Sequence, residues 1–340
     1  MEERNATRIR RELVKTSKRP LSGCSLLAMA LSAVPCPALA QAYPSKPIRV
    51  ILSNPAGTGQ DVELRHLVRS MAAELGTTII VENRPGGGQM LGMALVAKST
   101  PDGYTIGGGN NTNLAAHPRL YDRPSFQVER DVAPVSLFIR HPWVLYVNSG
   151  VPARSFQEFV ALAKANPQTI TFASPGVGTF SHLTLMLFQT STAVQLRHVP
   201  YGAQPWQPDL VGGHINSSMS ALIPLVDHVR SGKLRALAIS NGEARSPQVP
   251  DVPLFSELGL TQFNPTAWAG LVAPAAAPRS IIEKLSAAAA HAARTVQFAE
   301  LTDRVGATAV GSTATEFDTF LKVERARWKK VIADNGIRVD

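Results

Sequence analysis

The chain has 340 residues, of which 44% are hydrophobic and 17% charged, so it is long and apolar enough to bury a sizeable core. Its formal net charge is +9, from 34 basic and 25 acidic residues. The first 40 residues hold seven of the basic and three of the acidic residues, which leaves 27 and 22, or +5, for the remainder. That remainder contains no Lys/Arg cluster typical of a nucleic-acid surface, so we expect no nucleic-acid partner.

Residues 1–40 have the order of a secretory signal peptide. A basic segment from Arg4 to Arg19 precedes an apolar run from Cys24 to Val34, and the sequence Ala38-Leu39-Ala40 follows. This order predicts cleavage after Ala40 and a periplasmic location. The apolar run is too short to span a bilayer. A disordered basic tail is the alternative, but it does not explain the small residues at 38 and 40.

A lipoprotein signal is also spelled in this segment, by Leu21-Ser22-Gly23-Cys24. Such a box closes an apolar segment, whereas this one opens it, so we expect no lipid on Cys24. Cleavage after Ala40 removes both cysteines of the chain, Cys24 and Cys36. The mature protein is therefore expected to have no disulfide, no cysteine nucleophile and no thiolate metal site.

Short apolar segments alternate with amphipathic ones along the rest of the chain. Strands are expected at 48–52, 78–81, 104–107, 134–139, 144–147, 170–173, 197–199, 215–219, 234–239 and 268–272. Helices are expected at 62–75, 155–165, 182–191, 281–294 and 315–335, with Thr313 and Glu316 as a capping box before the last. The alternation predicts an α/β fold with mainly parallel sheets flanked by helices. The roughly 300 residues that follow the leader suggest two lobes. We expect strands that cross from one lobe to the other to join them.

Two strand-to-helix turns are candidate ligand sites, namely SNPAGTGQD at 53–61 and ASPGVGTFSH at 173–182. Ligands of open α/β sheets bind at such turns. Gly, Ser and Thr keep the backbone approachable and leave N–H groups for an anion. Neither turn contains Lys or Arg, and the first lacks both the P-loop lysine and the dinucleotide glycine spacing. They therefore favour a carboxylate held by backbone donors, although ordinary tight turns remain the alternative.

Further candidates are weaker. Asn110 lies in a run of glycine and amide residues at 107–113, and Tyr201 follows the strand at 197–199. Asp61 could act as a base, but in the first helical turn it is better explained by capping or charge complementarity. We find no Gly-x-Ser-x-Gly elbow, no His-Glu-x-x-His motif and no nucleophile–base pair, and the histidines show no metal-binding spacing. Neither an enzyme nor a metal or other cofactor is expected.

A collinear series of motifs runs through residues 43–337. These are YPSKPIR (43–49), PAGTGQD (55–61), VENRPGGG (81–88), PDGYT (101–105), ASPGVG (173–178), HVPY (198–201), GKLRALA (232–238), PDVP (250–253) and WAGL (268–271). In this series the chain resembles the Bug-type receptors, the periplasmic solute-binding proteins of tripartite tricarboxylate transporters. Each motif alone is modest, but their order is specific.

The resemblance implies a two-lobed Venus-flytrap (periplasmic-binding-protein) fold that binds a small carboxylic acid without catalysis and meets membrane transporter subunits. Lobe 1 is expected at 41–142 and 265–340 and lobe 2 at 143–264, in a monomer. The ligand-binding residues expected from it are Asn54, Pro55, Ala56, Gly57, Thr58, Gly59, Gln60, Asp61, Asn110, Ser174, Gly176, Gly178, Thr179, Tyr201 and Ser220.

The chain departs from the family pattern at several positions. Ser53-Asn54 replaces Pro and an aromatic residue, Gln60 replaces Thr, and Tyr201-Gly202-Ala203 replaces Tyr-Lys-Gly. Where relatives that bind amino acids can present an acidic residue, this chain has Ser220, so we expect non-amino acids to bind better than their amino analogues. Two other functions stay open: a carboxylate sensor for a membrane signalling partner, and an exported α/β enzyme.

Overall fold

The expected strands and helices are all present in the structure, a computed structural model that describes residues 43–116, 120, 126–202, 204–240 and 244–338. The expected leader, residues 1–40, lies outside the described residues. Within them, no helix is both long and apolar enough to cross a membrane.

The first sheet has six strands in the spatial order β11-β4-β10-β3-β1-β2. They are β1 (Ile48–Leu52), β2 (Ile79–Asn83), β3 (Thr105–Asn110), β4 (Val132–His141), β10 (Ala267–Pro274) and β11 (Thr308–Ala309). The sequence analysis missed β11, because two residues give no readable alternation of apolar and polar positions.

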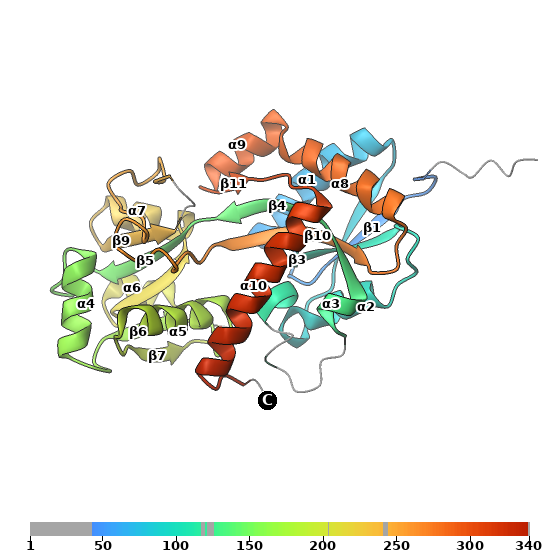
Figure 1. The fold of residues 1–340 in the computed structure, drawn as a ribbon. Helices are drawn as coiled ribbons and strands as arrows, with labels where there is room; N and C mark the ends of the chain where they lie inside the picture. The colour runs from blue at the N-terminus through green and yellow to red at the C-terminus, as the bar shows by residue number, and fades with distance from the viewer. Residues whose placement is uncertain (1–42, 117–119, 121–125, 203, 241–243, 339–340) are drawn as a thin grey trace, which may run out of the picture. The chain divides into compact units, whose positions relative to one another are not determined.

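The second sheet has five strands in the order β7-β6-β8-β5-β9. They are β5 (Trp143–Asn148), β6 (Thr171–Ser174), β7 (Arg197–Pro200), β8 (Ser217–Ala221) and β9 (Leu234–Ser240). The chain enters this sheet directly from the first, since β4 ends at His141 and β5 begins at Trp143. It returns through β10 (Figure 1).

Both sheets are mixed, so the expectation of mainly parallel sheets is wrong on strand direction. Strand β1 pairs in parallel with β2 and β3, and β6 pairs in parallel with β7 and β8. In contrast, β10 runs antiparallel to β3 and β4, and β5 runs antiparallel to β8 and β9. Strand–helix alternation predicts the direction of strands within βαβ units. It does not predict the direction of a strand that crosses from one sheet into the other.

Helices cover both faces of the first sheet, as the alternation of side chains along β1 requires. Val50 and Leu52 face a core formed with α1, α8 and α9, whereas Ile51 faces a core formed with α2 and α10. The helices are α1 (Gly59–Leu75), α2 (Met90–Ala97), α8 (Arg279–Ala293), α9 (Val296–Arg304) and α10 (Ala314–Asp334). The capping box expected at Thr313 and Glu316 is confirmed.

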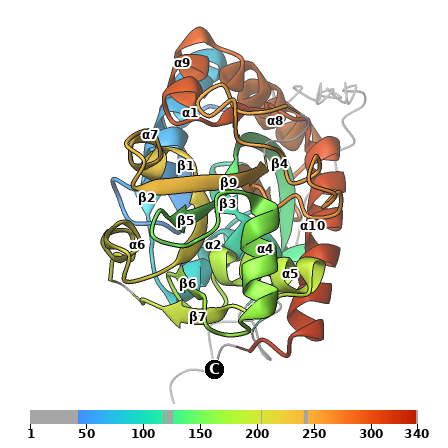
Figure 2. The same ribbon diagram turned by 90° about the vertical axis from the view of Figure 1, so that its left-hand side faces the viewer.

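The second sheet is covered in the same way (Figure 2). Leu145 and Val147 of β5 face α4 and α5, and Val144 and Tyr146 face α6 and α7. The helices are α4 (Phe156–Ala165), α5 (Phe180–Thr192), α6 (Gln207–Gly212) and α7 (Val226–Arg230). The remaining short helices are η1 (Gly87–Gln89), η2 (Thr112–Ala116), α3 (Val128–Asp131) and η4 (Ile223–Leu225).

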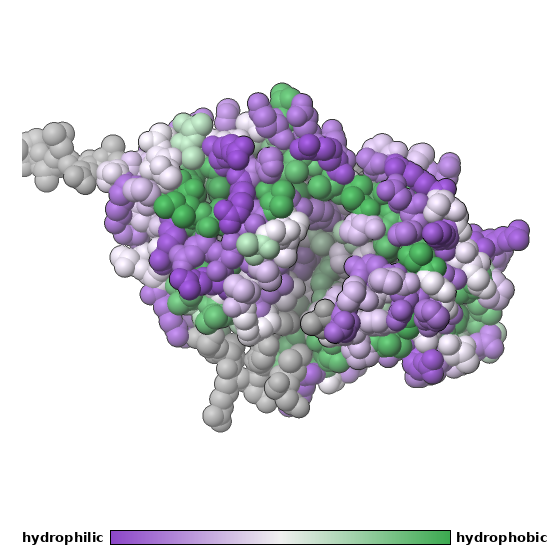
Figure 3. Space-filling view, turned by 180° about the vertical axis from the view of Figure 1, so that it is seen from behind, coloured by the Kyte–Doolittle hydropathy of each residue, from purple (hydrophilic) through white to green (hydrophobic). Residues whose placement is uncertain are grey.

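Helix α10 connects the two groups of elements. It packs on the first sheet through Phe317, and farther along its length Trp328 meets Phe180 at the start of α5, with 5.3 Å between ring centroids. The face seen from behind is mostly hydrophilic, with separate hydrophobic patches, and is hollowed near its middle (Figure 3).

Candidate functional site

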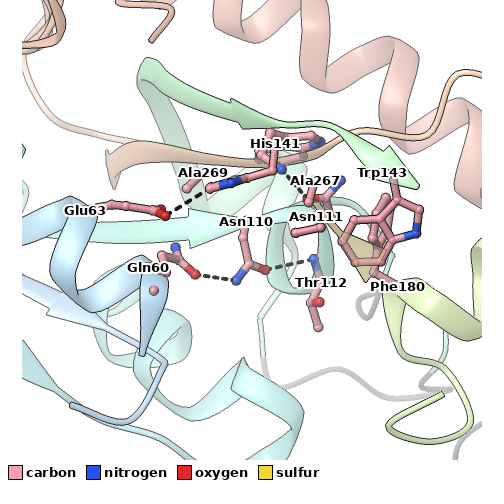
Figure 4. Close-up of a pocket in the computed structure, with 13 residues that line it drawn as sticks. Gln60, Glu63, Asn110, Asn111, Thr112, His141, Trp143, Phe180, Ala267 and Ala269 are labelled. Carbon is pink, nitrogen blue, oxygen red and sulfur yellow. Dashed lines mark hydrogen bonds and ion pairs between the residues drawn. The ribbon is translucent and has the colours of Figure 1, made fainter. Parts of the chain in front are cut away.

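A cavity of about 270 Å³ is lined by residues from both sheets (Figure 4). Its lining residues are Gly59, Gln60, Glu63, Asn110, Asn111, Thr112, His141, Trp143, Phe180, Ala221, Ala267, Trp268 and Ala269. Two larger hollows, of about 690 and 700 Å³, are lined by α1, α8 and α9 and by β4 and α10, respectively. We take the smaller cavity as the candidate site because only it, among these three, contains residues of the candidate turns.

The first turn is held in shape by Asp61. Its carboxylate accepts hydrogen bonds from the Gly57 N–H (3.0 Å), Asn83 Nδ2 (2.8 Å) and Arg65 Nε (3.0 Å). Burial opposes ionisation of this carboxyl, but the bonds from Arg65, Gly57 and Asn83 outweigh it and lower the pKa of Asp61. Gly57 has φ +80°, a conformation that favours glycine. Asp61 does not line the cavity.

The start of α1 offers free donors to the cavity. Thr58 occupies the N-cap position but makes no side-chain capping bond. The N–H groups of Gly59 and Gln60 belong to the first helical turn and find no acceptor among the described residues. Because both residues line the cavity, these donors and the positive end of the helix dipole are available to an anion there.

Gln60 and Asn110 form a bonded pair across the cavity wall (Figure 4). Asn110 Nδ2 donates to Gln60 Oε1 (2.7 Å) and to Gln89 Oε1 (2.8 Å), and its Oδ1 accepts from the Thr112 N–H (2.9 Å). The Asn110 amide is therefore occupied by protein partners. It fixes the position of Gln60, whose Nε2 donates to the Gly109 carbonyl (3.2 Å).

Asn111 ties the end of β3 to the strand that returns from the second sheet. Its Nδ2 donates to the Thr266 carbonyl (2.9 Å), and its Oδ1 accepts from the Trp268 N–H (2.7 Å). Both polar groups of this buried amide are satisfied. Asn111 thus positions the aromatic wall of the cavity at Trp268.

The second turn is also held by hydrogen bonds within itself. Thr179 Oγ1 accepts from the His182 N–H and donates to the Gly176 carbonyl, and the Gly178 N–H donates to His182 Nδ1 at 3.2 Å. The Gly176 N–H donates to Ser174 Oγ. The N–H groups of Gly176 and Gly178, which the sequence suggested were free, are therefore engaged within the turn.

Two stacked imidazoles support this second turn. The rings of His182 and His198 are 4.3 Å apart, and His198 Nε2 is 2.6 Å from Ser174 Oγ. Burial and the neighbouring His198 lower the pKa of His182 to about 4, and burial lowers the pKa of His198. Both rings are therefore neutral near pH 7. This geometry corrects the expectation of no serine–histidine pair, but the Ser174 side chain is fully buried.

The structure brings Gly59, Gln60 and Asn110 together at the cavity. The other expected ligand-binding residues are not among its lining residues: Asn54, Pro55, Ala56, Gly57, Thr58, Asp61, Ser174, Gly176, Gly178, Thr179, Tyr201 and Ser220. Tyr201 Oη donates to Asp209 Oδ2 at 2.6 Å, and burial together with this bond raises the pKa of Tyr201 to about 12. Ser220 Oγ lies 3.2 Å from the Ala221 carbonyl.

The sequence analysis missed a close contact between an acidic and a histidine side chain in the cavity wall. Glu63 reaches from α1 toward His141 at the end of β4, with Oε1 3.2 Å from Nε2 (Figure 4). The Glu63 side chain is only 6% exposed. Its position was readable, because residues 59 and 63 are four apart on a helix and therefore share a face.

The aromatic wall was also missed. Trp143 and Phe180 meet edge to face with ring centroids 4.8 Å apart. Trp268 also lines the cavity, although its ring packs against Phe320 and its Nε1 donates to Glu324 of α10. These residues lie on β5, at the start of α5 and on β10, and only the three-dimensional fold brings them together. No group of His, Cys, Asp and Glu side chains within the described ranges is arranged to hold a metal ion.

Comparison with known proteins places this architecture in a defined class. Residues 64–337 match the model of the tripartite tricarboxylate transporter family receptor. Protein BugT of Bordetella pertussis is 33% identical over 313 residues, covering 92% of this chain and 96% of BugT. A structure described as a periplasmic transporter is 32% identical, with a TM-score of 0.75, over 88% of this chain and all of that one.

A further relative carries a ligand. MatC of Rhodopseudomonas palustris, solved with bound malate, is 28% identical with a TM-score of 0.72, over 85% of this chain and 100% of that one. The fold is the two-lobed fold of periplasmic solute-binding proteins. The chain belongs to the tripartite tricarboxylate transporter receptor family, as the resemblance to Bug-type receptors implied.

Proposed function

We propose that this receptor binds a small carboxylic acid in the cavity between its two sheets and delivers it to the membrane subunits of a tripartite transporter. The observation that carries the proposal is the uncapped start of α1, where Gly59 and Gln60 present free N–H groups to the cavity. A carboxylate accepts several such donors at once, and hydrogen bonds to a charged group contribute about 1.5–3 kcal/mol each. The malate bound to MatC supports the class of ligand.

The volume of the cavity limits the size of the ligand. At about 270 Å³ it is smaller than the sites of roughly 300–1,000 Å³ that hold drug-sized molecules. The aromatic wall of Trp143, Phe180 and Trp268 buries the apolar part of the ligand, while α1 holds its carboxylate. Binding without turnover follows, because the one serine–histidine pair seen in the described part of the chain has a buried serine that does not line the cavity.

The proposal includes export and the division into lobes. The signal-like order of residues 1–40 favours a mature periplasmic protein that begins at Gln41, and N-terminal sequencing of the exported form tests this. A fatty-acylated Cys24 would contradict it. We retain residues 41–142 with 265–340 as lobe 1 and 143–264 as lobe 2, in a monomeric receptor.

Substitution of Gly59 tests the proposed site. Gly59→Asp places a carboxylate at the first position of α1, where the helix dipole favours it, so the fold is retained while an anionic ligand is repelled. Gly59→Ala is the matched control, since a Cβ atom there lies 3.7 Å from its nearest neighbour, an ordinary contact. Calorimetry with a panel of small carboxylic acids should show binding by the wild type and G59A and its loss in G59D.

Equal binding by G59D would place the ligand elsewhere and contradict the proposal. Turnover of a bound acid would favour the exported enzyme instead. Transport and sensing differ in the membrane partner: co-purification with two transporter subunits supports delivery, whereas capture of a signalling protein would support the sensor.

A further inference from the structure

The cavity contains an acidic group that a receptor for simple carboxylates does not need. Glu63 lines the cavity, its side chain is only 6% exposed, and its Oε1 is 3.2 Å from His141 Nε2. Glu63 Oε2 has no hydrogen-bond partner among the described residues, so one carboxylate oxygen remains available as an acceptor.

The Glu63 carboxylate lies near the start of α1 through Oε1, the same oxygen that faces His141. A Cβ atom at position 59 would be 3.7 Å from Glu63 Oε1, so the Glu63 carboxylate folds back toward the first turn of its own helix. A ligand carboxylate bound by the N–H groups of Gly59 and Gln60 therefore has an acidic neighbour. The two sites match a ligand whose carboxylate and hydrogen-bond donor are attached to the same carbon atom.

The other polar groups of the cavity do not compensate a second negative charge. Asn110 and Asn111 are occupied by protein partners, and the lining residues include no Lys or Arg. His141 Nε2 faces Glu63 Oε1 at 3.2 Å. A second ligand carboxylate would thus be desolvated next to Glu63 without a cation, which is unfavourable.

Apart from Thr112 and the Nε1–H of Trp143, the remaining wall of the cavity is apolar. Trp143 and Phe180 line it with three alanines, Ala221, Ala267 and Ala269. Trp268 lies beside them, with its ring packed against Phe320 of α10. The part of the ligand farthest from α1 therefore packs against rings and methyl groups, which favours an aliphatic or aromatic side chain.

We propose that Glu63 selects for a 2-amino monocarboxylate with an apolar side chain, whose ammonium group is bound by Glu63 while its carboxylate is bound at the start of α1. This rests on the proposed function and deepens it. It reverses the expectation drawn from Ser220, because the acidic partner for an amine is supplied by α1 rather than by the end of β8.

Matched pairs of acids test the assignment by calorimetry. The pairs are L-phenylalanine with 3-phenylpropanoate, L-leucine with 4-methylpentanoate, and L-aspartate with succinate. In the wild type the amino member of each apolar pair should bind at least about tenfold more tightly than its analogue, the effect of one charge-assisted bond. L-Aspartate should bind more weakly than either apolar amino acid.

Variants on the same helix separate charge from general effects. Glu63→Gln should abolish the preference for the amino member while leaving the binding of the analogue, and Glu63→Asp should keep part of it. Glu74→Gln, also on α1 with a side chain 49% exposed, is the matched control and should behave as wild type. Circular dichroism establishes that each variant is folded. If E63Q does not fold, the affinity ratios of the matched pairs in the wild type and in E63D test the role of Glu63.

The outcomes distinguish the two proposals. Equal or tighter binding of the deaminated acids, or an undiminished amino preference in E63Q, overturns the role of Glu63 while the carboxylate receptor stands. If L-aspartate or succinate binds most tightly, the proposed preference for an apolar side chain is wrong. If neither these compounds nor the carboxylate panel binds, both proposals fail.

Discussion

Asp61 lies in the first turn of α1 next to the cavity, yet its carboxylate accepts hydrogen bonds from Gly57, Asn83 and Arg65. Asp61 therefore stabilises the conformation of the turn rather than binding the ligand. Because these bonds lower the pKa of Asp61, the ionised form is favoured in the folded protein. The stability that it contributes is present above the unfolded pKa, about 3.9, and is lost as the pH falls through the lower folded value.

Asp61→Asn should therefore destabilise the protein at pH 7 by about 1.5–3 kcal/mol, the range for a hydrogen bond to a charged group. The difference from wild type should shrink as the pH falls below about 3.9 toward the lower folded pKa of Asp61, where its carboxyl becomes neutral like the Asn side chain. Urea unfolding at pH 7 and pH 3 measures it. Asp227→Asn, at a side chain 88% exposed, should show no comparable loss. A D61N protein as stable as wild type at pH 7 would contradict this role.

His182 carries the second residue-scale prediction. Its Nδ1 accepts the Gly178 N–H only when unprotonated, and its lowered pKa of about 4 favours the neutral ring in the folded state. This stability is complete above the unfolded pKa, about 6.5, and is lost as the pH falls toward 4. Wild type should lose up to about 3 kcal/mol over that window.

His182→Asn keeps an acceptor that does not titrate, so its stability should change less between pH 6.5 and 4. Thermal unfolding across this range measures the difference. The control is His291→Asn, whose side chain is 64% exposed in the wild type. The same pH dependence in H182N and wild type would show that another group is responsible.

At the scale of the element, the capping of the helices separates the two turns. At the start of α5, Thr179 accepts the His182 N–H, and His182 Nδ1 accepts the Gly178 N–H. At the start of α1, the N-cap residue Thr58 makes no side-chain capping bond. The two sequences look alike, since Gly-Thr stands directly before the helix in each, at 57–58 and at 178–179. The two turns differ at the third helical position, because Thr179 accepts the His182 N–H whereas Thr58 makes no such bond. The first two N–H groups of each helix have no acceptor among the described residues, and this difference in capping depends on side-chain rotation that a pattern of glycine and threonine does not predict.

The last helix gives a prediction at this scale. Thr313 Oγ1 accepts from the Glu316 N–H at 3.2 Å, and Glu316 Oε2 accepts from the Thr313 N–H at 2.8 Å. Thr313→Ala should cost about 1 kcal/mol of stability, a usual value for a lost N-cap. Thr315→Ala, one residue inside the helix, is the control and should be near neutral. Urea unfolding compares the two, and equal stability of T313A and T315A would contradict the capping role.

The sequence predicted the elements better than the site. Short apolar runs such as 48–52 and the capping box at Thr313 are local signals, and the structure confirms both. The cavity wall is not local: Trp143, Phe180 and Trp268 come from distant segments. Glu63 was within reach, because it lies one turn after Gly59 on the same face of α1. The direction of β10 was not, because it depends on how the chain passes between the sheets.

At the scale of the whole molecule, the site depends on elements that each sheet supplies. The first contributes the donors of α1 and the strand end at Asn110, and the second contributes Trp143 and Ala221. Asn111 and His141 fix the segments between them through Trp268 and Glu63. A ligand that fills this space contacts both sheets at once, so its binding energy favours the arrangement in which they enclose it.

The most direct test is a crystal structure of the protein with the tightest-binding acid from the calorimetric panel. The account predicts a carboxylate whose oxygens accept hydrogen bonds from the N–H groups of Gly59 and Gln60, with the rest of the molecule between Trp143, Phe180 and Trp268. A ligand seated only at the turn 173–182, or outside this cavity altogether, would contradict it.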